Sequence, residues 1–297
     1  MSTPCFSHAE SATAPSGIRL TTIIPWCNRL ELERTLRDNG PLLEAMRSQV
    51  VVVNCGGDAE LLQRLVASSG VAARRIDVPV KFNRSLAINI GIGCAEPGAL
   101  LILDADILLT STLRPYAECC VERRCFGILA GMTSLPPQRP LFTPPPGSFL
   151  RKVVTSVRES YHWADNRVSD VVLGRTDCAS DFRTACGIIL VVSDEMKAIG
   201  GYRSDFHGWG WEDIDVQVRL LRHGVASMLV HEEIRHLEHG NDVRDLNGTK
   251  LHESAAANRR RAWRAYCAGD LHGTYLADVE RWRPVISCRR VDAGAGA

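Results

Sequence analysis

Short apolar runs alternate with charged, helix-periodic segments through the first hundred residues, and this alternation constrains the fold more than any other feature. The expected strands are 18–25, 50–53, 76–80 and 99–103, and the expected helices are 29–46, 59–68 and 83–94. Strands that alternate with helices of this length form βαβ units, whose strands lie parallel in one sheet. We therefore predict an α/β fold in which helices flank a mostly parallel sheet.

The second half of the chain is less regular. The stretch 133–147 contains six prolines and little periodicity, which predicts a loop. Beyond it we expect strands at 185–192 and 225–230 and helices at 194–199, 212–222 and 251–267. The last residues, 292–297, are expected to fray.

Charge and composition exclude several classes of function. The formal net charge is +1 and there is no long basic block, so a nucleic-acid groove is not expected. Residues 1–17 are polar, unlike a signal peptide, and no window approaches the ~18 apolar residues of a membrane span, which predicts a cytoplasmic protein. The eleven cysteines include no C-x-x-C pair, so we expect reduced, mostly buried thiols.

Two carboxylates, Asp104 and Asp106, follow the expected strand 99–103. In an open parallel sheet, ligands bind beyond the carboxyl ends of the strands. Two acids at such a place can face a divalent cation and the ribose of a nucleotide together, and the cation would neutralise diphosphate charge. The alternative is a simple turn or helix cap.

A second cluster spans residues 206–215 (FHGWGWEDID). Two tryptophans among glycines offer a stacking surface, and three acids follow at the start of a helix, where the helix dipole stabilises negative charge. A carboxylate beside a tryptophan is a candidate general base. The alternative interpretation makes Asp213 an N-cap and Asp215 a solvated acid.

Two smaller groups complete the candidates. His231, His236 and His239 follow a strand, and one of them can complete a metal site with Asp106; the alternative is surface or packed histidines. His236 and His239 have helical i, i+3 spacing, which also suits zinc, although the nearby acids suit harder metals. Residues 81–84 (KFNR) open a helix and are candidates to hold a base and a phosphate, or else Phe82 is core and Asn83 an N-cap.

Taken in order, these segments resemble the β-1,4-galactosyltransferases and their bacterial family-2-type relatives, which are GT-A-fold transferases. The segments that carry the resemblance are 23–29 (IIPWCNR), 82–91 (FNRSLAINIG), 104–106 (DAD), 200–215 and 234–236 (IRH), which are similar to the family's IIPFRNR, FNRAxxxNxG, DVD, NGFxxxxWGWGGEDDD and IRH. The resemblance covers most of residues 18–245. It implies a GT-A fold with a Rossmann-like sheet and a C-terminal acceptor-binding or helical extension.

The resemblance also implies residue roles. Asp213 would be the catalytic base of an inverting transfer, and Glu212 would hold a sugar. Asp106 and His236 would ligate a metal. The residues implied in nucleotide-sugar binding are Pro25, Phe82, Arg84, Asp104, Gly187 and Trp209.

Several residues depart from the family pattern. Trp211 replaces a glycine before the acids, and Ile214 replaces the third acid. Cys27 replaces an arginine, which removes one phosphate or nucleotide contact. Glu233 stands where the family has a metal-ligating methionine. Because a carboxylate is a harder ligand than a thioether, we expect Glu233 to ligate Mn²⁺ or Mg²⁺.

We therefore expect a metal-dependent, inverting transfer of a hexose or N-acetylhexosamine from a UDP-sugar or other nucleotide sugar to an acceptor hydroxyl. The acceptor is a glycan, lipid-linked sugar, peptide or small molecule. The alternatives are a sugar-nucleotide nucleotidyltransferase and an inactive carbohydrate-binding protein of the same fold. The expected organisation is a flexible N-terminus (1–17), a nucleotide-sugar-binding half (18–132), a Pro-rich loop and insert (133–183), an acceptor and catalytic half (184–250) and a helical tail (251–297).

Overall fold

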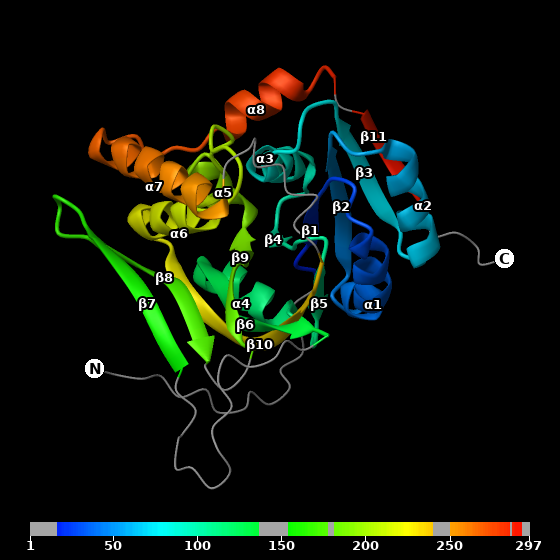
Figure 1. Cartoon of the computed structure of the whole chain (residues 1–297), viewed down its shortest axis with the longest axis horizontal. Coiled ribbons are helices and arrows are strands. Elements are labelled where there is room, and N and C mark those ends of the chain that lie inside the picture. The colour runs from blue at the N-terminus through cyan, green and yellow to red at the C-terminus, as the bar shows by residue number, and fades with distance from the viewer. Residues whose placement is uncertain (1–16, 137–153, 178–180, 240–249, 286, 293–297) are drawn as a thin grey trace, which may run out of the picture.

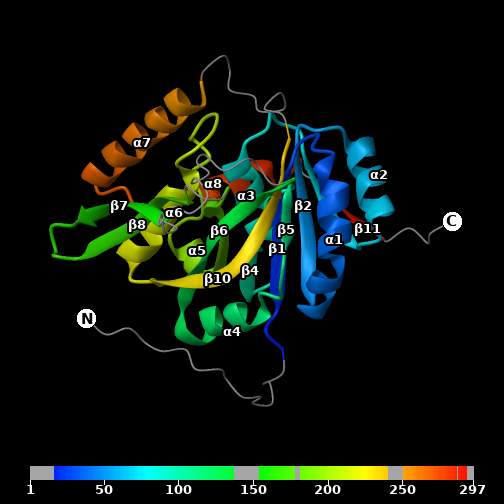
Figure 2. The same cartoon turned by 60° about the horizontal axis from the view of Figure 1, so that its bottom comes forward.

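The structure is a computed structural model that describes residues 17–136, 154–177, 181–239, 250–285 and 287–292. Our predictions for the N-terminal 1–16, for 137–147 of the Pro-rich stretch and for 293–297 lie outside these residues. Within the described part, one mixed sheet of eleven strands carries helices on both faces (Figures 1 and 2). The predicted α/β class is therefore confirmed.

The sheet has the order β11-β3-β2-β1-β4-β9-β6-β10-β5, and β8 joins it beside β9 with β7 at its outer side. The predicted parallel block is present as β3-β2-β1-β4. Beyond β4, antiparallel pairs with β9 reverse the direction. The strands are β1 (Leu20–Trp26), β2 (Ser48–Cys55), β3 (Ala73–Val78), β4 (Ala99–Ile102), β5 (Ile107–Leu109), β6 (Cys125–Leu135), β7 (Val154–His162), β8 (Val168–Asp177), β9 (Arg183–Val192), β10 (Ala226–Leu237) and β11 (Ser287–Val291).

The helices cover the two faces of the sheet and define two buried apolar layers. One layer packs α1, α2 and α4 against residues such as Ile24 and Val52. The other packs α3, α5, α6 and α8 against the alternate residues of the same strands, such as Ile23 and Val53. This alternation is what a sheet buried on both faces requires. The helices are α1 (Glu31–Ala45), α2 (Ala59–Ser69), α3 (Arg84–Cys94), α4 (Arg114–Arg123), α5 (Ser193–Ala198), α6 (Glu212–His223), α7 (Leu251–Cys267) and α8 (Tyr275–Trp282).

Local sequence explains where these helices begin and end. The Asp58 carboxylate accepts hydrogen bonds from the first-turn amides of α2, and Asn83 accepts one from the amide of Leu86 in α3. Gly70 and Gly224 end α2 and α6 in the left-handed conformation, at φ of 73° and 95°, which glycine adopts without steric cost. The N-cap interpretation of Asn83 is therefore correct.

The largest departures from the predicted elements lie after residue 106. The predicted strand 225–230 extends to Leu237 as β10, with an irregularity between Val230 and Glu233. The β7–β8 hairpin and helix α8 carry no periodicity that predicted them, and the hairpin projects from the sheet beneath α7 (Figure 1).

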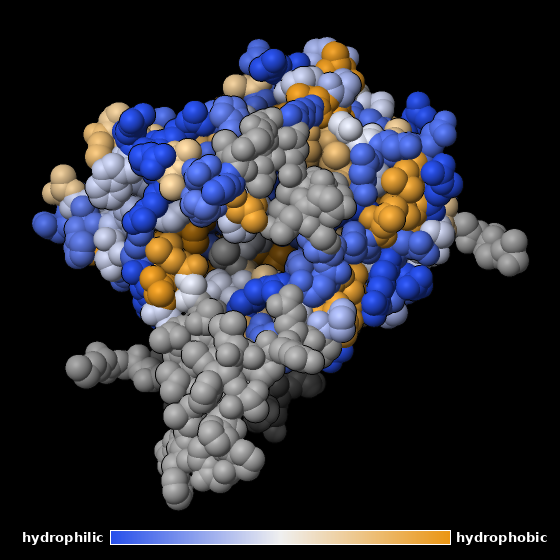
Figure 3. All heavy atoms as spheres, viewed as in Figure 1, coloured by the Kyte–Doolittle hydropathy of each residue, from blue (hydrophilic) through white to orange (hydrophobic). Residues whose placement is uncertain are grey.

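Among the described residues, no helix is long and apolar enough to cross a bilayer. On the face shown in Figure 3, hydrophobic side chains form separate small groups among hydrophilic ones. Scattered groups of this kind are normal for a folded chain.

Candidate active site

The turn between β4 and β5 carries Asp104 and Asp106, and helix α1 fixes it. The Thr35 hydroxyl donates to the carbonyl of Ala105 over 2.8 Å, in a buried setting. The amide of Ile107 donates to the carbonyl of Asp104 over 3.3 Å, which closes the turn. The two carboxylates therefore leave the turn at defined positions.

The strand that follows the turn is held by one buried amide side chain. Asn39 in α1 donates to the carbonyl of Ile107 and accepts from the amide of Leu109, both over 2.8 Å. Because this one buried side chain satisfies both a donor and an acceptor of β5, it fixes the position of β5 along helix α1. This matters because β5 is the strand on which β10 aligns.

Strand β10 brings two histidines to Asp106. His236 lies opposite Ile107 in the antiparallel pair of β10 with β5, and the amide of Leu237 donates to the carbonyl of Asp106 over 2.8 Å. His236 Nε2 lies 3.8 Å and His239 Nε2 2.9 Å from the same carboxylate oxygen of Asp106. One ligand atom from each of the three residues lies within 4.8 Å of the others. We call Asp106, His236 and His239 the metal cluster.

The electrostatics of the metal cluster favour an ionised carboxylate. Burial raises the pKa of Asp106, but the hydrogen bond with His239 and the charge of His236 outweigh burial and leave the pKa below its ordinary value. An ionised carboxylate and two imidazoles are ligands for a divalent transition metal.

Glu238 orients one of these histidines, and the sequence analysis did not find it. Its Oε1 lies 3.1 Å from His236 Nδ1, accepts from Ser134 Oγ over 2.6 Å and accepts from Arg183 over 2.8 Å. These donors lower the pKa of Glu238 to about 2, although burial works in the other direction. A carboxylate behind a histidine directs the opposite ring nitrogen at a metal. The only sequence signal was its position between the two histidines.

The geometry of β10 corrects three predictions about its histidines and about Glu233. Glu233 is exposed and does not lie in the metal cluster, because side chains alternate along a strand and it is three residues from His236. The helical spacing assigned to His236 and His239 is wrong, since His236 belongs to β10 and His239 follows its end. His231 is exposed and lies outside the cluster.

A second cluster forms around Arg84, the first residue of α3. Its guanidinium donates to Asp104 over 2.8 Å, to Asp213 over 2.6 Å and to the carbonyl of Gly187 over 2.9 Å. Gly187 leaves room for this arrangement, because a Cβ there would lie 3.1 Å from the Asp213 carboxylate. Burial disfavours the charge of Arg84, but Asp104 and Asp213 hold its pKa well above the ordinary value.

The carboxylates at the start of α6 are buried beside this arginine. Burial and the negative charge of Asp213 together raise the pKa of Glu212 to about 7, although the charge of Arg84 acts in the other direction. Burial also raises the pKa of Asp213, against the effect of Arg84. The Tyr202 hydroxyl lies 3.5 Å from the Asp213 carboxylate. Perturbed carboxyl groups in a cleft are typical of catalytic sites.

The alternative interpretations of the acids in α6 are wrong. Asp213 makes no cap, because Trp211 occupies the N-cap position and Asp213 pairs with Arg84. Asp215 is fully buried rather than solvated. Its carboxylate accepts from Arg219 over 2.8 Å and from the Tyr266 hydroxyl over 2.8 Å. Asp215 therefore ties α6 to α7 and does not face the cleft.

The residue before these acids holds a conformation that suits glycine. Trp211 has φ 79° and ψ −18°, and its ring lies under the Arg259 guanidinium at 5.0 Å. Left-handed backbone costs a non-glycine residue about 1–2 kcal/mol. Trp211 thus holds a backbone conformation that a glycine would adopt without this cost.

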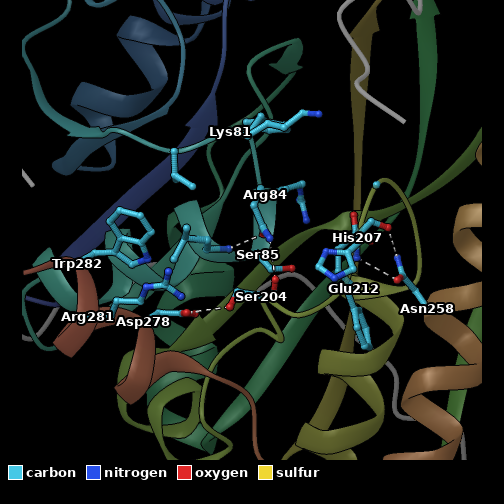
Figure 4. Close-up of a pocket in the computed structure, with 16 residues that line it drawn as sticks. Lys81, Arg84, Ser85, Ser204, His207, Glu212, Asn258, Asp278, Arg281 and Trp282 are labelled. Atoms are coloured by element: carbon cyan, nitrogen blue, oxygen red, sulfur yellow. Dashed lines mark hydrogen bonds between the residues drawn. The ribbon is translucent and has the colours of Figure 1, made fainter. Parts of the chain in front are cut away.

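A groove of about 270 Å³ opens beside Glu212 and Arg84 (Figure 4). Phe82 lines it and is 41% exposed, so the core interpretation of Phe82 is wrong. Other lining residues are Lys81, Ser85, Ser204, His207, Asn258 and Trp282. Of the other predicted nucleotide-sugar contacts, Trp209 is 44% exposed in the loop before α6, and Pro25 is buried in β1.

Comparison with known proteins adds to this geometry. Residues 169–241 match the family model described as the N-terminal domain of galactosyltransferase. No curated protein matches the sequence. The structure of GalNAc-T7 with UDP, GalNAc and Mn²⁺ is similar at a TM-score of 0.51, with 13% identity over 74% of this chain and 44% of that one.

The Drosophila β1,4-galactosyltransferase 7 catalytic domain in complex with xylobiose matches at a TM-score of 0.45, with 17% identity over 82% of this chain and 80% of that one. Its mutant with manganese, UDP-Gal and xylobiose matches at 0.44, with 17% identity over 79% and 76% of the two chains.

The fold and the matched segment together indicate a glycosyltransferase of the GT-A class. Within that class, the matched segment 169–241 carries β8, β9, α6 and β10, which hold Gly187, Asp213 and His236. The galactosyltransferases are therefore the glycosyltransferases that this chain resembles.

Proposed function

We propose that this enzyme transfers a hexose or N-acetylhexosamine from a UDP-sugar, or another nucleotide sugar, to an acceptor hydroxyl with inversion, and that it requires a divalent metal. One observation carries the proposal. Asp106 belongs to the metal cluster, while Asp104, two residues earlier, shares the Arg84 guanidinium with Asp213. A carboxylate of the metal cluster and a carboxylate that shares an arginine with Asp213 thus lie at the two ends of one short turn.

The ligand set supports Mn²⁺ more than Mg²⁺. Mg²⁺ prefers oxygen ligands in octahedral geometry, whereas two imidazoles and one carboxylate suit a softer divalent ion. The metal cluster contains His239 and not the predicted ligand Glu233. An imidazole in place of a carboxylate favours Mn²⁺ over Mg²⁺. GalNAc-T7, which is similar in fold, was solved with UDP and Mn²⁺, and we extend that ligand class to this chain as part of the proposal. When bound, the metal supplies positive charge to the diphosphate leaving group.

The residues of the second cluster have complementary roles. Asp213 accepts the proton of the acceptor hydroxyl as general base, which a direct displacement with inversion requires. Arg84 holds a buried positive charge beside Asp104 and stabilises negative charge that develops on the leaving group. Glu212 lines the groove and hydrogen-bonds a sugar hydroxyl there.

The groove beside Glu212 supports substrate binding next to these acids. Phe82 and Trp282 provide aromatic faces, and Lys81, Ser204 and His207 provide polar groups. Aromatic faces with a few polar groups are typical of sites that orient small ligands.

The test is a screen of nucleotide sugars with and without Mn²⁺, read by thermal shift and then by product analysis. A donor at 100 times its Kd stabilises the protein by about 2.7 kcal/mol. Release of nucleoside diphosphate with a glycosylated acceptor is the expected product. Pyrophosphate would indicate nucleotidyl transfer instead, and donor binding without turnover across acceptors would indicate an inactive binding protein.

A further inference from the structure

The loop before α6, residues 207–211, needs support from outside itself. Gly208, Gly210 and Trp211 have φ of 72°, 93° and 79°. Three of the four residues 208–211 have left-handed backbone, so the loop cannot form a regular pattern of backbone hydrogen bonds. This backbone shape is therefore kept only where neighbouring groups impose it. The loop leads directly into Glu212 and Asp213, and its backbone therefore sets where those carboxyl groups begin.

Asn258 in α7 supplies part of this support through its side-chain amide (Figure 4). Its Oδ1 accepts from the amide of His207 over 3.2 Å, and its Nδ2 donates to the carbonyls of His207 and Gly210 over 3.0 and 2.9 Å. The side chain is 3% exposed. One buried amide thus spans both ends of the loop.

Ser254 lies one turn earlier on the same face of α7. Its hydroxyl donates to the carbonyl of His207 over 2.9 Å and accepts from the amide of Trp209 over 2.8 Å. Ser254 is 5% exposed and does not line the groove, whereas Asn258 does. The two residues together make five hydrogen bonds, all to the backbone of the loop.

The adjacent α7 residues add packing to the same loop. A Cβ at Gly210 would lie 2.9 Å from the Ala255 Cβ, so the loop backbone is in close contact with the helix. Arg259 lies over the Trp211 ring. By contrast, Arg260 and Arg264 are exposed, and neither makes a hydrogen bond or ion pair with the loop among the residues described.

Helix α7 lies beyond the segment that matches the galactosyltransferase model, which ends at residue 241. We infer that α7 positions the catalytic carboxyl groups, with Ser254 and Asn258 as positioning residues that act through the backbone of residues 207–211. This inference rests on the proposed function, because it concerns the turnover of the acids that begin α6. It assigns a role to the part of the chain that the sequence analysis described only as a helical tail.

The experiment compares S254A and N258A with R260A and R264A, which change the exposed face of the same helix. A displacement of about 1 Å at reacting groups costs up to about 100-fold in rate. We expect S254A and N258A to lower kcat by at least 10-fold at an almost unchanged donor KM. S254T keeps the hydroxyl, so this variant should retain most of the wild-type kcat. R260A and R264A are expected to stay within twofold of wild type.

Hydrogen exchange provides a second readout that does not depend on activity. The amides of Trp209 and His207 donate to Ser254 and Asn258, so each should exchange faster in the corresponding alanine variant while core amides keep their protection. Unchanged exchange at these amides, or a kcat of S254A equal to that of R260A, would overturn the inference. If wild type transfers no sugar, the proposed function fails, and the exchange data still decide whether α7 holds the loop. If N258A alone fails to fold, S254A and S254T carry the test.

Discussion

Arg84 NH1 lies 2.6 Å from a carboxylate oxygen of Asp213, although 129 residues separate the two in the chain. The same guanidinium binds Asp104, so one buried cation links the end of β4 with the start of α6. A buried arginine that neutralises two acids holds the candidate site together before any substrate is bound.

Asp213→Asn should lower kcat by about 100-fold or more, because an amide cannot accept the proton of the acceptor hydroxyl. Donor binding should persist, since Arg84 keeps its contact with Asp104. Steady-state kinetics with a saturating acceptor measure the effect. Asp205→Asn is a matched control, because Asp205 is an exposed acid near the same loop. A fall in kcat of similar size in both variants would contradict the assignment.

His239→Ala should weaken Mn²⁺ binding by at least about 10-fold, since even outer-shell changes at metal sites cost 10–100-fold. Glu233→Ala should leave the affinity within twofold, because that side chain lies outside the metal cluster. Isothermal titration with Mn²⁺ distinguishes the two. Equal losses of Mn²⁺ affinity in the two variants would show that Glu233 is a metal ligand.

Glu238→Gln should weaken Mn²⁺ binding by about 10-fold, because a neutral amide orients His236 less strongly than a carboxylate does. Glu232→Gln is the control. Its carboxylate contacts Ser111 and Tyr116 and does not touch His236. Equal affinities for the Glu238 variant and wild type would show that Glu238 only supports β10 and Arg183.

Glu212→Gln should flatten the dependence of stability on pH. The folded pKa of about 7 exceeds the ordinary 4.5, so the folded state binds more protons between these values. The free energy of unfolding therefore falls as pH rises from about 4.5 to 7, by up to about 1.4 kcal/mol per pH unit. Denaturant titrations across this window should show a shallower decline in the variant. Parallel curves would contradict the raised pKa.

Gly187→Ala should reduce kcat at least 10-fold while the protein stays folded. The added Cβ would lie 3.1 Å from Asp213 and 3.3 Å from Arg84, so these two groups must shift. Displacement of reacting groups by a fraction of an ångström is costly in rate. Gly174→Ala is the control, since a Cβ there meets no atom within 4 Å. Wild-type turnover in the Gly187 variant would show that the cluster tolerates rearrangement.

Much of the framework follows from local sequence. Apolar runs flanked by Asp58, Gly70 and Asn83 predict β2, α2 and α3 because capping and strand burial depend on neighbouring residues. The motif resemblance identified Asp106, His236 and Asp213 before their positions were known. The β7–β8 hairpin and α8 carried no comparable local signal.

Local sequence patterns are enough to predict the parallel half of the sheet, the helix ends and the chemical types of the candidate site residues. Which of these residues meet depends on the tertiary structure. It selected His239 over Glu233, placed Glu238 behind His236, buried Asp215 and brought Asn258 to the loop before α6. The physical reason is that side-chain direction along β10 depends on its register with β5 and β6, including the irregularity after Val230. Register of this kind is set by partners distant in the chain, so local pattern cannot fix it.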